Sequence, residues 1–272
     1  MLRTFFSWLC KPKVRLGPNI LLQSSFGLMI INVNDKYIGS AIRDAGIWQH
    51  EEIQFILRLA EFLISQNGSI FVYDIGANIG QHSLALASTF KDKIEIRAFE
   101  PQQLIFQMLC GNMALNNIQN VNCECALVSS ENGISNSVRL PDYNLENNFG
   151  GLEFIKARYS DNGDMRFGVK TANVGCVTVD SFNEHVHLMK IDVEGMEELV
   201  LNGALTVISK SRPICYVETK KVGVEPIRAF FDRAQYKVFA RGDNVVAIPS
   251  EWLINISFLD FFSRPSSASL QK

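Results

Sequence analysis

The stretch that decides the fold is residues 70–80, which read IFVYDIGANIG. A short apolar run ends in Asp74, and two glycines, Gly76 and Gly80, precede a segment with helical spacing that begins at residue 81. A buried strand, a glycine-bearing turn and a helix in this order are typical of the first unit of a doubly wound α/β sheet. Because such sheets bind ligands at the carboxyl ends of their strands, we expect a binding site where this strand ends.

The alternation of strand and helix continues on the C-terminal side of this stretch. We predict strands at residues 94–99, 121–128, 152–157, 165–169, 188–192 and 214–218, and helices at 81–90, 102–115, 196–209 and 224–234. The turn sequence RGDN at 241–244 separates two more apolar runs and predicts a C-terminal antiparallel hairpin. The expected fold is a three-layer α/β/α sandwich around a mostly parallel, Rossmann-like sheet.

Length and composition predict one main domain with an extension at each end. The chain has 272 residues, of which 47% are hydrophobic, enough for one well-buried core. We expect an N-terminal cap at 1–66, with a small hairpin around Asn34 and Asp35 and a helix at 53–64. The main α/β domain is expected at 67–250, followed by a C-terminal segment at 251–272 that ends in a frayed tail.

Charge and hydropathy limit the partners. A net charge of -2 gives no general attraction for phosphate backbones, so we expect no nucleic-acid partner. No stretch approaches the roughly 18 apolar residues that span a bilayer, so we expect no transmembrane segment and a cytoplasmic protein. Contact of the apolar N-terminus, around Phe5 and Trp8, with a membrane surface stays open, as does the oligomeric state. The six cysteines lack zinc-site spacing, and no metal ligands are assigned.

After the glycine turn, the second candidate for ligand binding is Glu100, at the end of the next predicted strand. A carboxylate there can accept hydrogen bonds from both hydroxyls of a ribose, although an acid is also favourable before a helix. Asn78 stands where a dinucleotide-binding turn has its second glycine, which favours a ligand without a pyrophosphate. A nicotinamide-dependent oxidoreductase remains an alternative, because its adenosine ribose would suit Glu100 equally well.

The third candidate is the run KIDVEG at 190–195, which places Asp192 and Glu194 after another predicted strand. Acids before a helix are often caps. Acids at three strand ends of one sheet, however, indicate a shared cleft.

Together these motifs resemble the FkbM-type methyltransferases. The resemblance rests on DIGANIG at 74–80, FEP at 99–101, MKIDVEGME at 189–197, RPI at 212–214 and Glu218, and it covers roughly residues 46–248. It implies a class I methyltransferase fold, S-adenosylmethionine as the methyl donor and, usually, a hydroxyl oxygen as the acceptor.

The resemblance also implies roles for individual residues. Those expected to bind the donor are Asp74, Gly76, Asn78, Gly80, Glu100 and Asp192. Those expected near the acceptor, a small molecule or a glycan, are Trp48, Glu51, Asn148, Gly150 and Glu218. Gln49 stands where the family commonly has an acid, which leaves the role of the N-terminal cap open.

Methyl transfer requires alignment of the acceptor and removal of its proton. We rank Glu194 first as the general base, then Asp192, with His50 and His82 after them, and expect His185 and His187 to be structural. The acceptor hydroxyl would belong to a carbohydrate, a glycolipid or a small molecule. Two variants stay open: a magnesium-dependent enzyme, for which no third ligand is visible at motif spacing, and a binding module that has lost turnover.

Overall fold

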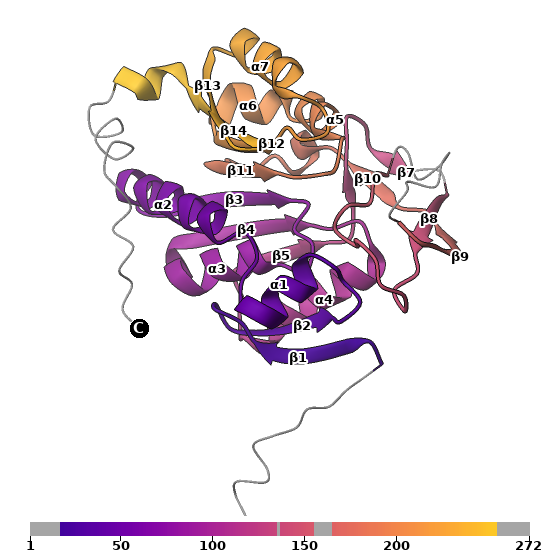
Figure 1. Ribbon diagram of the computed structural model, residues 1–272. Coiled ribbons are helices and arrows are strands. Elements are labelled where there is room, and N and C mark those ends of the chain that lie inside the picture. Colours follow the sequence, from indigo (N-terminus) through magenta and orange to yellow (C-terminus); the bar gives the residue numbers. More distant parts are fainter. Residues whose placement is uncertain (1–16, 135–136, 155–164, 255–272) are drawn as a thin grey trace, which may run out of the picture.

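The computed structural model describes residues 17–134, 137–154 and 165–254. A central sheet lies between two layers of helices (Figure 1), and its strand order is β13-β14-β12-β11-β3-β4-β5. The strands are β3 (Ile70–Ile75), β4 (Ile94–Phe99), β5 (Val121–Glu124), β11 (Leu188–Ile191), β12 (Ile214–Glu218), β13 (Tyr236–Arg241) and β14 (Asn244–Pro249). β3, β4, β5, β11 and β12 pair in parallel. The predicted three-layer α/β/α sandwich with a mostly parallel sheet is confirmed.

The predicted C-terminal hairpin is also present, and its second strand, β14, runs opposite to the other strands of the sheet. β14 pairs antiparallel with both β12 and β13, so β13 runs in the same direction as β12. β14 therefore carries the turn at 242–243 to the edge of the sheet where β12 ends, since Asn244 pairs with Glu218.

Side chains alternate along each strand between two helical layers. Ile70 and Val72 pack in one apolar cluster, and Tyr73 and Ile75 pack in the other. The first layer contains α2 (His50–Asn67), α3 (Gln81–Phe90) and α4 (Gln103–Leu115); the second contains α5 (Glu197–Asn202), α6 (Leu205–Ser211) and α7 (Val224–Arg233). Burial on both faces explains why these strands read as continuous apolar runs.

The predicted hairpin around Asn34 and Asp35 is wrong. The hairpin lies earlier, as β1 (Asn19–Gln23) and β2 (Leu28–Asn32), and a helix absent from the prediction, α1 (Ile38–Ala45), follows. Asp35 lies in the turn before this helix, where its buried carboxylate accepts the N–H of Tyr37 at 3.1 Å, so this turn joins a strand to a helix and not two strands.

Three further elements differ from the prediction. The helix expected at 196–209 is divided into α5 and α6, because Gly203 lies against the backbone of Ser129, where an added Cβ would be 2.1 Å from the carbonyl oxygen. The strand at 121–128 is likewise divided into β5 and β6 (Leu127–Val128). Residues 152–154 form no strand, and 155–157 lie outside the described residues, as do the N-terminal apolar segment at 5–9 and the tail from 255.

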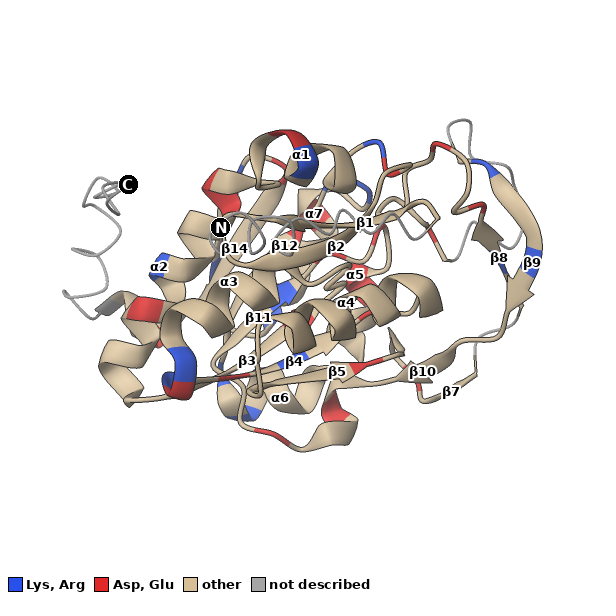
Figure 2. Ribbon diagram, turned by 90° about the horizontal axis from the view of Figure 1, so that it is seen from below, with Lys and Arg blue, Asp and Glu red and all other residues tan. Residues whose placement is uncertain are grey.

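Two small sheets extend the fold beside the end of β4 and β5. β6 pairs with β10 (Gly175–Val177), which also pairs with β7 (Gly133–Ile134), and β8 (Val138–Pro141) pairs with β9 (Phe167–Ala172). Both views show the β8–β9 ribbon standing to one side of the main sheet (Figures 1 and 2). The 3₁₀ helices are η1 (Lys91–Lys93), η3 (Val179–Phe182) and η4 (Ser250–Ile254). Across the described ranges, no helix combines the length and apolar character needed to cross a membrane.

Two asparagines of α4 attach the β1–β2 hairpin to the main domain. Asn112 accepts the N–H of Ile30 at 2.6 Å and donates to the carbonyl of Ile79 at 2.8 Å, within the turn after β3. One helical turn later, Asn116 accepts the N–H of Leu28 at 2.8 Å and donates to its carbonyl at 2.7 Å. These amides take the place of a neighbouring strand for β2 and connect the N-terminal segment with the turn.

We expect Asn112→Ala to lower the free energy of unfolding by about 1–3 kcal/mol, because it leaves buried backbone groups of Ile30 and Ile79 without partners. Urea denaturation measures this change. Gln107→Ala, an exposed amide on the same helix, is the matched control and should change it little. Equal effects of the two substitutions would contradict this function of Asn112.

Candidate active site

A cavity of about 1030 Å³ opens at the carboxyl ends of β3, β4, β11 and β12. It lies where the winding of the sheet reverses, with β4 and β5 on one side of β3 and with β11 and β12 on the other. Gly76, at the end of β3, has a φ of +81°, and a Cβ there would lie 1.8 Å from the carbonyl oxygen of Asp192. Only glycine permits this approach between the first turn and the end of β11.

The turn after β3 is joined to the end of β4. The N–H groups of Gly76 and Ala77 donate to the carbonyl of Phe99 at 3.1 and 2.9 Å. Glu100 accepts the N–H of Asn78 at 3.1 Å with one carboxylate oxygen and that of Gln102 at 2.8 Å with the other. The predicted proximity of the glycine turn and Glu100 is thus confirmed. Burial of this carboxyl group raises its pKa to about 7.

Asp74 and Gly80 lie behind the residues that line the cavity. Asp74 is 1% exposed; it accepts the Ser83 hydroxyl at 2.7 Å and lies 3.5 Å from the ammonium of Lys190. Gly80 packs against α4, where a Cβ would be 2.4 Å from the Leu109 side chain. In this structure the two residues support the turn, and their predicted contacts with a donor remain untested.

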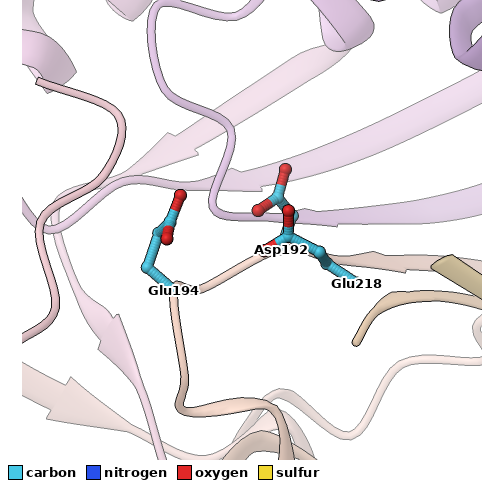
Figure 3. Close-up of side chains that lie close together, drawn as sticks. All are labelled: Asp192, Glu194 and Glu218. Carbon is cyan, nitrogen blue, oxygen red and sulfur yellow. The ribbon is translucent and has the colours of Figure 1, made fainter. Parts of the chain in front are cut away.

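Three carboxylates gather across the cavity from Glu100. Asp192 and Glu194 follow β11 and Glu218 ends β12, and each offers an oxygen within 4.8 Å of the others. The three side chains point to the same side of the sheet end (Figure 3). Burial and the charge of Asp192 raise the pKa of Glu194 to about 7, and burial with the charges of Asp192 and Glu194 raises that of Glu218. The cluster therefore binds protons near neutral pH.

The same spacing would admit a divalent cation. Glu218 is the third acid of the cluster, which motif spacing did not reveal, because β12 lies beside β11 only in the folded sheet.

Lys190, which the sequence analysis left unassigned, holds together the two sides of the cleft. Its ammonium is 3.4 Å from both the carbonyl of Gly76 and the carboxylate of Asp192. Burial alone would lower the pKa of Lys190, but the charges of Asp192, Asp74 and Glu52 outweigh it and raise the pKa. A lysine inside an apolar run was the signal in the sequence, because a buried cation requires acidic partners.

The third wall comes from the N-terminal segment and the last hairpin. The predicted residues Trp48, His50 and Glu51 line the cavity, and so does Glu52, which the prediction omitted. Glu52 lies 3.4 Å from the imidazole of His82 and accepts a hydrogen bond from Asn244 at 3.2 Å. Burial would raise the pKa of Glu52, yet His82 and Lys190 hold it below its usual value. Tyr216 and Arg241 complete this polar wall.

Residues 147–151 close the remaining side, and both predicted residues there, Asn148 and Gly150, line the cavity. Asn147 exchanges backbone hydrogen bonds with residues 34 and 36, and Gln102 donates to the carbonyl of Phe149 at 2.8 Å. His187 lies at the opposite end of the sheet, as predicted, and its imidazole accepts the N–H of Phe71 at 3.0 Å.

Sequence comparison relates the chain to known methyltransferases. A model of the FkbM methyltransferase domain matches residues 74–238. Methyltransferase sdnD of Sordaria araneosa is 30% identical over 158 residues, which cover 49% of this chain and 60% of sdnD. The chain therefore matches somewhat less than two thirds of that relative.

Two solved structures are similar at low identity. Methyltransferase FkbM from Methylobacillus flagellatus KT has a TM-score of 0.45 at 17% identity, over 66% of this chain and 43% of that one. Precorrin-6y C5,15-methyltransferase from Geobacter metallireducens GS-15 has a TM-score of 0.40 at 11% identity, over 66% of this chain and 78% of that one.

The family match extends over more than half of the chain and contains the Gly76 turn, Glu100 and the acids at 192–194. The resemblance found in the sequence is confirmed, and the chain belongs to the FkbM family of methyltransferases.

Proposed function

We propose that the protein transfers a methyl group from S-adenosylmethionine to a hydroxyl group of a carbohydrate, a glycolipid or another small molecule. One observation carries the proposal: the Gly76 turn and Glu100 line the same cavity as Asp192, Glu194 and Glu218. The volume of about 1030 Å³ lies at the upper end of the range for small-molecule sites, which supports binding of a donor and an acceptor together.

The residues around Glu100 fit an adenosyl group. Both oxygens of this buried carboxylate already accept backbone N–H groups, and their remaining lone pairs suit the two hydroxyls of a ribose. Leu127 lines the same cavity and offers apolar surface for a flat base. The absence of a Cβ at Gly76 lets the carbonyl of Asp192 approach the turn, which brings the acids after β11 close to the proposed donor site.

The acid cluster fits proton removal from a hydroxyl group. S-adenosylmethionine, when bound, supplies a methyl group on a sulfonium centre, and an acceptor oxygen must approach it in line. Glu194 accepts the hydroxyl proton, since a base with a pKa of about 7 is available at neutral pH. Asp192 follows β11 and lies 3.4 Å from Lys190, and its proposed place is beside the transferred methyl group.

The alternatives are separated by binding and turnover. The family match gives no support to a nicotinamide-dependent oxidoreductase, which rested on Glu100 alone. A non-catalytic binding module with this fold would bind S-adenosylmethionine and methylate nothing. The protein and methyl-labelled S-adenosylmethionine can be incubated with a deproteinised cell extract and the products examined by mass spectrometry. A labelled product identifies the acceptor and shows a methyltransferase, whereas a binding module yields no labelled product.

We expect Glu100→Ala to weaken S-adenosylmethionine binding by about 1–3 kcal/mol, because charge-assisted hydrogen bonds are lost. Isothermal titration calorimetry measures the change, with Glu95→Ala, an exposed acid on the same strand, as the control. Unaltered affinity in Glu100→Ala, or no binding to the wild-type protein, would reject the proposed donor site.

Glu194→Gln should preserve donor binding and lower kcat by on the order of a hundredfold or more, because general-base catalysis is lost, and Asp192→Asn should also lower kcat. Since Glu194 acts as its carboxylate, wild-type kcat/KM should rise with pH through about 7, and this rise should be missing in Glu194→Gln. Glu225→Gln, an exposed acid on α7, is the control. Parallel losses of donor affinity and turnover in Glu194→Gln would show that the role of Glu194 is misassigned.

We assign no metal to the acid cluster, because Lys190 and Lys221 lie 3.4 and 3.7 Å from the carboxylates of Asp192 and Glu194 and reduce its attraction for a divalent cation. Turnover should therefore be the same before and after treatment with EDTA. Activity that EDTA abolishes and magnesium restores would make the cluster a metal site instead.

A further inference from the structure

Glu197 is a buried acid that the proposed mechanism does not use. It is the first residue of α5 and is 1% exposed. One carboxylate oxygen accepts the N–H of Val193 at 3.3 Å and that of Gly195 at 3.2 Å. The other oxygen is buried without a hydrogen-bond partner among the described residues. An ionisable group in such a place is costly, so its contacts require an explanation.

The two N–H groups that Glu197 accepts flank Glu194. Glu194 has a φ of +53° and Gly195 a φ of +93°, so two consecutive residues adopt the left-handed conformation. A residue with a side chain enters this region only at a conformational cost, and surrounding contacts must hold it there. The backbone bonds to Glu197 are such contacts.

This loop conformation directs Glu194 toward the acid cluster. Its carboxylate lies within 4.8 Å of Asp192 and Glu218. From the other side, Lys221 approaches Glu194 at 3.7 Å while its ammonium binds Glu153 at 2.7 Å. Lys221 thus contacts the side chain of Glu194, and Glu197 fixes the backbone that carries it.

We propose that Glu197 is a positioning residue, whose carboxylate clamps the loop at 193–195 and holds Glu194 in the orientation required to accept the hydroxyl proton. The inference rests on the proposed function, because the role of Glu194 belongs to it. It differs from simple helix capping, since both N–H groups precede α5 and belong to the loop that bears the base.

Three substitutions of Glu197 separate the effect of its side-chain length from the effect of its charge. Glu197→Gln keeps an acceptor oxygen at the same distance, Glu197→Asp keeps the charge but is one methylene shorter, and Glu197→Ala removes both. Glu198→Ala, the exposed acid at the next position, is the matched control. With the acceptor identified by labelling, kcat should fall on the order of tenfold to a hundredfold in the Asp and Ala variants, because misplacement of a catalytic group by about 1 Å has that effect. Glu197→Gln and Glu198→Ala should stay near wild type, and all variants should bind S-adenosylmethionine with unchanged Kd.

Hydrogen–deuterium exchange provides a second readout that does not depend on turnover. The amides of Val193 and Gly195 should be protected in the wild type and in Glu197→Gln and should exchange faster in Glu197→Asp and Glu197→Ala. If the wild type binds no S-adenosylmethionine, the proposed function fails, and protected amides would show only that the clamp exists.

The clamp itself is overturned if these amides exchange equally in all variants. Its role in positioning Glu194 is overturned if Glu197→Asp retains kcat while Glu197→Gln loses it, or if the Kd for S-adenosylmethionine rises as kcat falls. Should Glu197→Ala fail to fold, the Asp and Gln variants give the same decision.

Discussion

The contact between the turn after β3 and the end of β11 is the constraint on which the cleft depends. A Cβ at Gly76 would lie 1.8 Å from the carbonyl oxygen of Asp192, so any other residue would push the two strands apart. β3 and β11 meet where the winding of the sheet reverses, and one carries the glycine turn while the other carries the acids. Their separation therefore sets the distance between the proposed nucleoside site and the proposed base.

The charged residues along the same contact determine how readily the acids of the cleft bind a proton. Lys190 is buried between Asp74 and Asp192, so its positive charge is balanced by these two carboxylates within the wall of the cleft. Burial, together with the charge of Asp192 in the same cavity, raises the pKa values of Glu194 and Glu218, and Lys221, 3.7 Å from Glu194, offsets only part of this rise. A carboxylate that releases and accepts a proton near neutral pH is suited to general-base catalysis. The arrangement of Lys190, Lys221 and several acids, rather than any single residue, supports that role.

The sequence predicts the sheet well because its strands are buried on both faces and its glycines stand at required positions; the helix at 81–90 and the strands at 94–99 and 214–218 have the bounds observed. Prediction from the sequence fails where one residue type occurs in more than one kind of local structure. The turn at Asp35 leads into a helix and not into a second strand, and Gly203 divides a continuous helical pattern because Ser129 packs against it. Glu52, Tyr216 and Lys190 lie in the site through long-range contacts, which local periodicity does not contain.

The most direct test of this account is a crystal structure of the protein with S-adenosylhomocysteine. The account predicts both ribose hydroxyls within about 2.6–3.0 Å of the carboxylate of Glu100. It also predicts the thioether sulfur between the Gly76 turn and the cluster of Asp192, Glu194 and Glu218. A nucleoside bound elsewhere, or a sulfur directed away from these acids, would contradict it.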